Sequence, residues 1–223
     1  IYDDKSKTYE LCGKNKRHPH PDRIKIEADY SNGAFLLTLG ALSERGLWVR
    51  GFDEKTQQGD AKIIEILKQI GAHITEEKDQ KNEGKINYFV KRGKIRATNI
   101  DASDIPDLVP ILALILSLAD GKSEICGINR LRFKESDRIK STIDMINSIG
   151  GSAKYEDDKI IIHGNGSNRL KGGRMRSYGD HRIAMAGVVA TSVCEAPVEI
   201  DDISCISKSW PEFMDVIKRI SQD

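Results

Sequence analysis

The chain has 223 residues, enough to bury one large hydrophobic core or two small ones. Its 35 basic and 34 acidic residues leave a net charge of +1, which argues against a general nucleic-acid-binding protein, because such proteins are usually strongly basic. The four cysteines form no CxxC pair and no zinc-ligand spacing, so reduced thiols in a cytoplasmic protein are the simplest interpretation, and no apolar run has the length of a membrane span.

The N-terminal part of the chain carries little structural signal. It begins at Ile1 rather than Met and shows no signal-peptide pattern, which favours a fragment or a processed product. Residues 13–21 are expected to form a loop whose basic side chains face solvent. Residues 1–28 therefore stand apart from the patterned remainder of the chain.

The patterned remainder is organised as a repeat. Asp29, Asp104 and Asp180 lie 75 and 76 residues apart, and each opens an apolar stretch that ends near residue 42, 119 or 193. Self-similarity at a regular spacing of this size indicates repeated structural units. Each apolar stretch is typical of a buried helix, and a strand-like run and a second helix follow it. The predicted strands are 47–50, 123–126 and 197–200, and the predicted second helices are 58–70, 135–149 and 211–220.

Hydrophobic alternation after the second helices predicts further strands at 86–90, 95–99 and 159–163. The second helix of the first unit is amphipathic, with aliphatic side chains on one face between residues 63 and 70. Three such units would pack their apolar helices around a shared axis and place their sheets outside. The sequence therefore predicts an α/β fold with buried helices and outer sheets.

Two short strings combine acidic, basic and fixed positive charges at predicted helix starts. They are Lys-Glu-Ser-Asp-Arg at 134–138 and Asp-His-Arg-Ile-Ala-Met at 180–185. Because helix starts present free backbone N–H groups and the positive end of the helix dipole, they suit anionic ligands. Two such starts in one chain predict a site for a multiply charged anion. The alternative is a pair of solvated helix ends with ordinary caps.

Together with the repeat, and with Lys208 ahead of Trp-Pro-Glu-Phe at 210–213, these strings resemble the 5-enolpyruvylshikimate-3-phosphate synthase family. Gln-Gly-Asp at 58–60 and Ile-Pro-Asp at 105–107 fit the same pattern, and the match runs from Asp29 to the C-terminus. The resemblance implies one lobe of the enolpyruvyl transferase inverse α/β barrel-like fold, in which each lobe has three βαβαββ units.

The resemblance also divides the chain. Residues 29–223 are expected to be the C-terminal lobe, with units at about 29–103, 104–179 and 180–223. Residues 1–28 are expected to be the tail of the other lobe and the segment that crosses between lobes. The N-terminal lobe of the same enzyme is then the partner that this chain lacks.

The family transfers the enolpyruvyl (carboxyvinyl) group of phosphoenolpyruvate to the 5-hydroxyl of shikimate 3-phosphate and releases phosphate. The resemblance implies this cytoplasmic, aromatic-biosynthesis activity, without a metal or another cofactor and without a nucleic-acid or membrane partner. Because the other lobe supplies further substrate contacts, the isolated chain is expected to fold, to bind phosphoenolpyruvate poorly and not to turn over.

Binding two phosphorylated substrates that also carry carboxylates needs several fixed cations. The resemblance assigns Arg138 and Arg182 to phosphoenolpyruvate, and a guanidinium fork suits its carboxylate. Lys208 is assigned to the phosphate, which a lysine binds as a point charge. Arg130 stands where some family members carry an asparagine that contacts shikimate 3-phosphate, and Asn129 lies one position earlier, so either residue is a candidate for this contact. The alternative for each residue is an exposed salt bridge.

The reaction adds the acceptor hydroxyl to C2 of the enol phosphate while C3 takes a proton, so it needs a base and an acid. The resemblance indicates Asp107 as the base that contacts the acceptor, and Glu135 as the proton donor and acceptor at C3. Lys134 is expected to hold the shikimate hydroxyl or to steady the leaving phosphate, and His181 to assist proton movement. The alternative for Asp107 is a helix cap, for which Asp104 is the better candidate.

Other polar residues of the motifs are interpreted as structural. Ser136, Asp137 and Asp180 are expected to cap helices and to orient their neighbours. Gln58 and Asp60 are expected to have structural roles.

Three other functions compete with this interpretation. A UDP-N-acetylglucosamine enolpyruvyl transferase would share the architecture, but its motifs match residues 134–138 less well. A non-catalytic repeat module that binds nucleic acid or a protein is disfavoured by the near-zero net charge and the low aromatic content. An RNA-end cyclase uses a related repeat, but its nucleotide-binding residues find no match in this sequence.

Overall fold

The computed structural model describes residues 2–3, 8–9 and 26–222 of the chain. The first two of these ranges are the strands β1 (Tyr2–Asp3) and β2 (Thr8–Tyr9), which form an antiparallel pair. The loop predicted at 13–21 and most of the predicted crossing segment lie outside the described residues.

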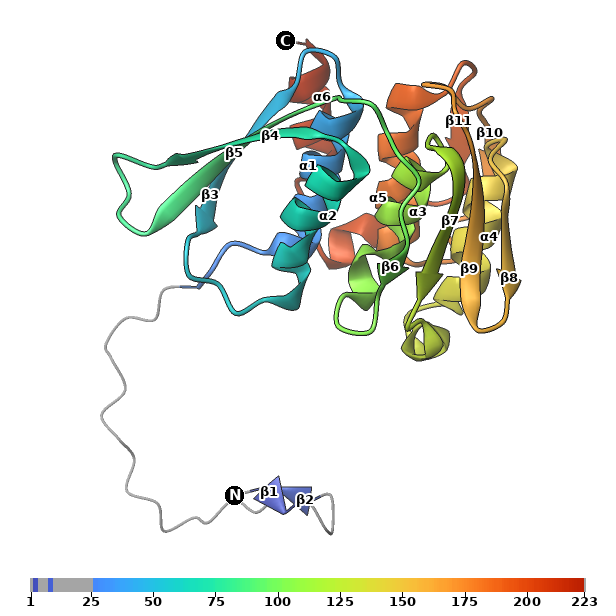
Figure 1. Cartoon of the computed structure of the whole chain (residues 1–223), viewed down its shortest axis with the longest axis horizontal. Coiled ribbons are helices and arrows are strands. Elements are labelled where there is room, and N and C mark those ends of the chain that lie inside the picture. Colours follow the sequence, from blue (N-terminus) through green and yellow to red (C-terminus); the bar gives the residue numbers. More distant parts are fainter. Residues whose placement is uncertain (1, 4–7, 10–25, 223) are drawn as a thin grey trace.

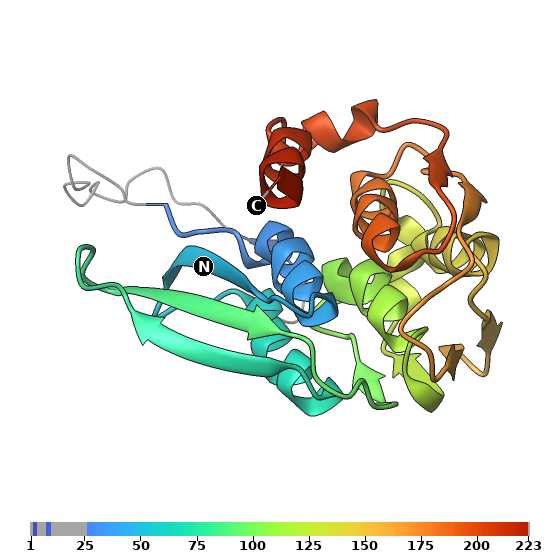
Figure 2. The same cartoon turned by 90° about the horizontal axis from the view of Figure 1, so that it is seen from above.

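Three helices lie side by side at the centre of the fold and contact one another pairwise (Figures 1 and 2). They are α1 (Tyr30–Leu42), α3 (Val109–Leu116) and α5 (His181–Ala190). Every residue of α3 and of α5 is buried, which explains why neither helix has a continuous polar face. The predicted burial of the first helices is therefore confirmed for these two. In the described part of the chain, no helix combines the length and the apolarity needed to cross a bilayer.

Aspartates cap two of the central helices, and the cap at Asp180 was predicted. Asp29 accepts hydrogen bonds from the backbone N–H groups of Ser31 and Asn32, at 2.8 and 3.2 Å, in the first turn of α1. Asp180 accepts one from the N–H of Arg182, at 2.9 Å, in the first turn of α5. Both carboxylates satisfy donors that the helix itself cannot pair.

The predicted cap at Asp104 is wrong. The turn that leads into α3 is the 3₁₀ helix η2 (Pro106–Leu108), and its N-cap is Ile105. Because proline favours the first helical position, this turn starts at Pro106, one residue too late for an Asp104 cap. The Asp104 carboxylate instead pairs with Lys62 at 3.3 Å on the surface.

The second helices are α2 (Ile63–Ile70), α4 (Arg138–Ser148) and α6 (Phe213–Gln222). The predicted apolar face of α2 is confirmed, since all its isoleucine and leucine side chains are buried. The helix ends at Gly71, whose φ of +111° lies in the left-handed region that favours glycine. α4 starts at Arg138 and not at the predicted residue 135, because Asp137 is its N-cap.

The strands form small sheets outside the helices (Figure 2). One sheet has the order β3 (Leu47–Asp53), β5 (Lys85–Lys91), β4 (His73–Lys78). A second has the order β6 (Ile100–Asp101), β7 (Asp120–Cys126), β9 (Lys159–Asn165), β8 (Ala153–Glu156). β10 (Gly173–Met175) pairs in parallel with β11 (Val198–Ile200).

The strand predicted at 95–99 is wrong in its bounds, because β6 begins only after it and an isolated bridge at Arg96 is all that remains. Side chains interrupt the ladder there. The backbone N–H of Thr98 donates to Ser123 Oγ at 3.1 Å, and Asn99 Oδ1 accepts a backbone N–H of β7 at 3.1 Å. These bonds replace the carbonyl partners that a regular strand would use.

Candidate active site

Arg138, the first residue of α4, lies at the centre of the site and its side chain is fully buried. Its Nη1 donates to Asp107 Oδ1 at 2.6 Å, and its Nη2 pairs with Glu135 Oε2. Its Nε and Nη2 donate to the two carboxylate oxygens of Asp180, at 2.9 and 3.2 Å. Since a guanidinium carries its five N–H donors in one rigid plane, a single side chain holds carboxylates from three separate segments in fixed directions.

Asp107 lies in η2, just before α3, and collects two more cations. Lys134 Nζ lies 3.1 Å from its Oδ1, and Arg182 Nη2 lies 3.4 Å from its Oδ2. Burial raises the pKa of the Asp107 carboxyl, but the positive charges of Arg182, Lys134 and Arg138 outweigh that effect and hold the pKa below its usual value. Asp107 is therefore ionised at neutral pH and can accept a hydrogen bond from a hydroxyl group.

His181 and Glu135 face each other across the site. His181 Nδ1 lies 3.9 Å from Glu135 Oε1, and His181 is the first residue of α5. Burial lowers the pKa of His181, and the neighbouring Arg182 lowers it further. The imidazole is therefore neutral at pH 7, and it can pass a proton without adding another cation. Glu135 keeps 44% of its side chain exposed, so it is the carboxylate in this group with the most freedom to move.

Arg182 has spare binding capacity. Its side chain is only 9% exposed, yet its Nη1 is buried without a hydrogen-bond acceptor among the described residues. A buried charged donor without a partner is costly, so an anion that reached Nη1 would gain the full value of the missing bond. Arg182 thus has one donor that no described residue satisfies, although this nitrogen has almost no surface exposed to solvent.

Lys208 and Arg130 lie at the margins of the same end of the molecule. Lys208, in the 3₁₀ helix η5 (Ser204–Lys208), places its Nζ 3.4 Å from the carbonyl oxygen of Gly179, directly before the cap of α5. Arg130, in η3 (Asn129–Phe133), lines a small pocket of about 350 Å³ together with Asp107 and Asp60. Neither side chain joins the ion pairs around Arg138.

The structure therefore brings the predicted residues to one end of the fold, where the central helices begin. Direct contacts link one set around Asp107 and Arg138, whereas the others lie beside it. The linked set is Asp107, Lys134, Glu135, Arg138 and Arg182, with His181, Lys208 and Arg130 around it. The roles of these residues toward substrates stay predictions.

The sequence analysis missed how much of the site depends on two buried carboxyl groups. Asp180, interpreted as a cap and an orienting residue, also anchors Arg138 through both of its oxygens. Asp60 accepts a hydrogen bond from Ser31 Oγ and lines the pocket beside Asp107, and burial raises its pKa. The Gln-Gly-Asp string at 58–60 was the available signal, but nothing in its spacing places it near residue 107. Gln58 has the expected structural role, since it accepts the backbone N–H of Tyr30 at 3.0 Å.

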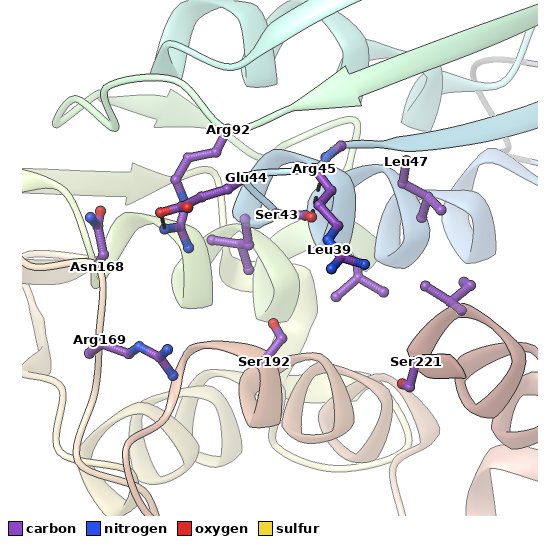
Figure 3. A pocket seen from close by; sticks show the side chains of 13 residues that line it. Leu39, Ser43, Glu44, Arg45, Leu47, Arg92, Asn168, Arg169, Ser192 and Ser221 are labelled. Atoms are coloured by element: carbon purple, nitrogen blue, oxygen red, sulfur yellow. Dashed lines mark hydrogen bonds and ion pairs between the residues drawn. The ribbon is translucent and has the colours of Figure 1, made fainter. Parts of the chain in front are cut away.

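A larger pocket, of about 770 Å³, lies elsewhere (Figure 3). It is lined by Leu39 near the end of α1, by Ser192 just after α5, and by Arg45, Arg92 and Arg169. These residues mark the C-terminal ends of the central helices, so the pocket and the candidate site lie at opposite ends of the bundle. The larger cavity therefore lies at the end of the molecule opposite the charged motifs, and cavity size would not have led to them.

Comparison with known proteins identifies relatives that have the same enzyme name. Residues 1–217 match the family model described as EPSP synthase (3-phosphoshikimate 1-carboxyvinyltransferase). The 3-phosphoshikimate 1-carboxyvinyltransferase of Clostridium kluyveri is 43% identical over 188 residues, which are 84% of this chain and 42% of that protein. The enzyme of the same name from Clostridium perfringens is 34% identical over 212 residues, or 95% of this chain and 48% of that protein.

Solved structures agree with the sequence relatives. An EPSP synthase from Acinetobacter baumannii superimposes with a TM-score of 0.75 at 29% sequence identity, and the match covers 87% of this chain and 46% of that one. This chain thus spans less than half the length of the two curated relatives named above. Its fold, its motifs and these likenesses agree, and the chain belongs to the EPSP synthase family.

Proposed function

We propose that this chain supplies half of the active site of an enzyme that transfers the enolpyruvyl group of phosphoenolpyruvate to the 5-hydroxyl of shikimate 3-phosphate and releases phosphate. The observation that carries the proposal is the contact between motifs far apart in the sequence. Asp107, Arg138 and Arg182 come from three segments, and ion pairs of 2.6 and 3.4 Å join them through the Asp107 carboxylate. Membership of the family supports the substrate assignment.

The proposal includes the architecture of the full-length enzyme. Residues 29–223 form its C-terminal lobe, with three repeated units of βαβαββ type of which the third lacks its final strands among the described residues, and residues 1–28 belong to the tail of the other lobe and the crossing. The substrates bind between the two lobes, and the N-terminal lobe provides the remaining contacts. The match to less than half of each curated relative supports this division. The free thiols of Cys126, Cys194 and Cys205 agree with a cytoplasmic location.

Arg182 is the main contact for phosphoenolpyruvate in this lobe, because its buried Nη1 lacks an acceptor. Lys208 lies at the same end of α5 and binds the phosphate as a point charge. Arg138 is held by three carboxylates, so its contact with phosphoenolpyruvate requires one of them to move. Glu135, with 44% of its side chain exposed, is the carboxylate that moves away from Arg138 when phosphoenolpyruvate binds.

Asp107 and Lys134 bind and activate the 5-hydroxyl group of shikimate 3-phosphate. The ionised Asp107 carboxylate accepts the proton of the 5-hydroxyl, and the Lys134 ammonium, 3.1 Å from Asp107 Oδ1, stabilises the negative charge that develops on the oxygen. The hydroxyl oxygen bonds to C2 of phosphoenolpyruvate while C3 takes a proton. Arg130, across the pocket from Asp107, contributes a weaker contact with the acceptor.

Glu135 donates the proton to C3 and takes one back when the tetrahedral intermediate loses phosphate. Glu135 gives its proton to C3 in the addition and carries one again after the elimination, and the neutral His181, 3.9 Å away, assists by orienting this carboxyl group. The sequence of addition and elimination uses one carboxyl group first as an acid and then as a base. It requires both substrates to be held in attack geometry, which one lobe alone does not provide.

Steady-state phosphate release by the full-length protein tests the proposal. Phosphate is expected with phosphoenolpyruvate and shikimate 3-phosphate together, and not with UDP-N-acetylglucosamine as acceptor. The purified 223-residue chain is expected to give no turnover with either acceptor. Release with the UDP-sugar alone, no release with shikimate 3-phosphate, or turnover by the isolated chain would each contradict the proposal.

A further inference from the structure

A short chain of hydroxyl groups lies behind the ion pairs of the candidate site. Ser136 Oγ lies 3.0 Å from Asp180 Oδ2 and 2.9 Å from Ser141 Oγ. Asp180 and Ser141 are buried, and Ser136 is partly buried. This chain runs from the first turn of α4 to the cap of α5, and so it connects the two charged motifs underneath the groups that face the site.

The donors and acceptors in this chain have only one consistent direction. The other partners of Asp180 are the Arg138 guanidinium and the backbone N–H of Arg182, and all of them donate. A carboxylate in that position accepts, so Ser136 donates its hydroxyl proton to Oδ2. Its own oxygen is then free to accept the hydroxyl proton of Ser141. Both serines therefore orient the carboxylate that anchors Arg138.

The serine is not needed to start the helix. The N-cap of α4 is Asp137, whose carboxylate accepts the backbone N–H of Lys140 at 3.4 Å. Ser136 makes no backbone contact of this kind, and its hydroxyl is directed at Asp180 and Ser141. Helix capping therefore does not account for the Ser136 hydroxyl group.

We propose that Ser136, supported by Ser141, is a positioning residue for the reaction: it fixes the Asp180 carboxylate so that Arg138 holds Asp107 and Glu135 in their working directions. The inference rests on the proposed function. Arg138 Nε and Ser136 Oγ share one oxygen of Asp180, at 2.9 and 3.0 Å, so loss of the hydroxyl lets the carboxylate rotate and the guanidinium follow. Displacements of this kind are amplified at a site that depends on orientation.

The test uses the full-length protein with phosphoenolpyruvate and shikimate 3-phosphate. Ser136→Ala is expected to lower kcat about tenfold, the usual weight of a hydrogen bond to a charged group, with little change in the KM of either substrate. Ser136→Thr keeps the hydroxyl and is expected to stay within about twofold of the parent, while Ser141→Ala falls between them. Ser148→Ala, an exposed serine on the same helix, is the matched control and is expected to change nothing.

Two further measurements separate positioning from general destabilisation. Ser136→Ala is expected to move the acid limb of the kcat/KM profile to higher pH, because a misplaced Arg138 no longer lowers the pKa of Asp107 fully. The Arg138 Nε–H proton, followed by nuclear magnetic resonance, is expected to exchange with solvent at least about tenfold faster in Ser136→Ala than in Ser148→Ala, since its bond to Asp180 is weakened.

The outcomes distinguish failure of this inference from failure of the proposed function. If the parent protein lacks the transferase activity, the proposed function fails, and the exchange rate of the Arg138 Nε–H still decides whether Ser136 positions Asp180. An active parent with unchanged kcat, acid limb and exchange rate in Ser136→Ala overturns the inference. So does an equal loss of activity in Ser136→Ala and Ser136→Thr, because the hydroxyl would then not be the group that matters.

Discussion

The two ends of the central helix bundle both carry arginines, but they use them differently. At the end where α1, α3 and α5 begin, Arg138 is fully buried and bound to three carboxylates. At the other end, Arg92 Nη1 lies 3.5 Å from Glu44, whose side chain is 83% exposed, and Arg169 Nη1 donates to the carbonyl oxygen of Cys194 at 3.3 Å. The charges are tightly paired at the first end, whereas the contacts of Arg92 and Arg169 at the second are longer, and the partner of Arg92 is exposed.

Helix polarity explains much of this difference. Helix starts expose N–H groups and positive dipole ends, so carboxylates and anionic ligands are stabilised there. Helix ends expose carbonyl groups, which attract arginines as partners, and the carbonyl of Cys194 follows directly after the last turn of η4 (Thr191–Val193). Arg169 at the far pocket is thus accounted for by helix termination, although that pocket is the larger cavity.

The sharpest test of this contrast is removal of the buried guanidinium. Arg138→Met leaves Asp180 buried without its main charge partner, and such a loss typically costs about 3–5 kcal/mol of unfolding free energy. Urea denaturation of the chain measures this difference. The double variant Arg138→Met with Asp180→Asn is expected to recover part of the loss, because no unpaired charge remains. A loss below about 1 kcal/mol in the single variant would show that the tightly paired end is no different from a surface ion pair.

Catalysis should distinguish the same two ends. In the full-length protein, Arg182→Ala is expected to lower kcat/KM for phosphoenolpyruvate about 100-fold, since a charge-assisted contact with an anion is worth roughly 2–3 kcal/mol. Arg169→Ala, at the far pocket, serves as the matched control and should leave kcat/KM within about twofold. Equal losses in both variants would indicate that the far pocket also takes part in the reaction.

A third effect depends on pH. Burial raises the pKa of Asp60 above its ordinary value of 3.8. A carboxyl whose folded pKa is raised contributes its full stability below the unfolded pKa and loses it as the pH rises through the folded pKa. Asp60→Asn keeps an acceptor for Ser31 but does not titrate, so it is expected to be more stable than the parent at pH 7 and to lose that advantage near pH 4. Urea midpoints of the variant and the parent at pH 7 and pH 4 measure this difference in stability. A variant that is less stable than the parent at pH 7 would contradict the prediction.

Local patterns predicted much of the fold, and the exceptions have physical causes. The cap at Asp180 and the buried face of α2 follow from residue type and helical period, which act within a few residues. Residue type favoured Asp104 as the cap, but Pro106 takes the first position of η2, so the N-cap falls on Ile105 instead. The strand at 95–99 was overextended because its alternation does not reveal that Ser123 and Asn99 would take over the backbone bonds.

The motifs predicted which charged residues come together at this end of the fold, but not how they are arranged. Residue types and motif spacing pointed to Arg138 as a cation for a ligand, but they do not indicate that Asp107, Glu135 and Asp180 would occupy its donors. That arrangement arises when helix starts from separate segments meet, and so it depends on tertiary packing. The same packing leaves Arg182, and not Arg138, with an unpaired buried nitrogen.

The smallest effect on the unfolding free energy is expected for substitution of Arg92 at the far pocket. Arg92→Met removes a guanidinium whose Nε is buried without an acceptor among the described residues and whose contact with Glu44 is long and exposed. Loss of the weak ion pair destabilises the fold, whereas removal of the buried unpaired donor stabilises it. The unfolding free energy should therefore change by less than about 1 kcal/mol. Urea denaturation beside Arg138→Met gives the direct contrast, because the two substitutions are the same and only the surroundings differ. A loss at Arg92 as large as that at Arg138 would mean that burial and carboxylate contacts do not set the value of an arginine in this fold, and the distinction between the two ends would then fail.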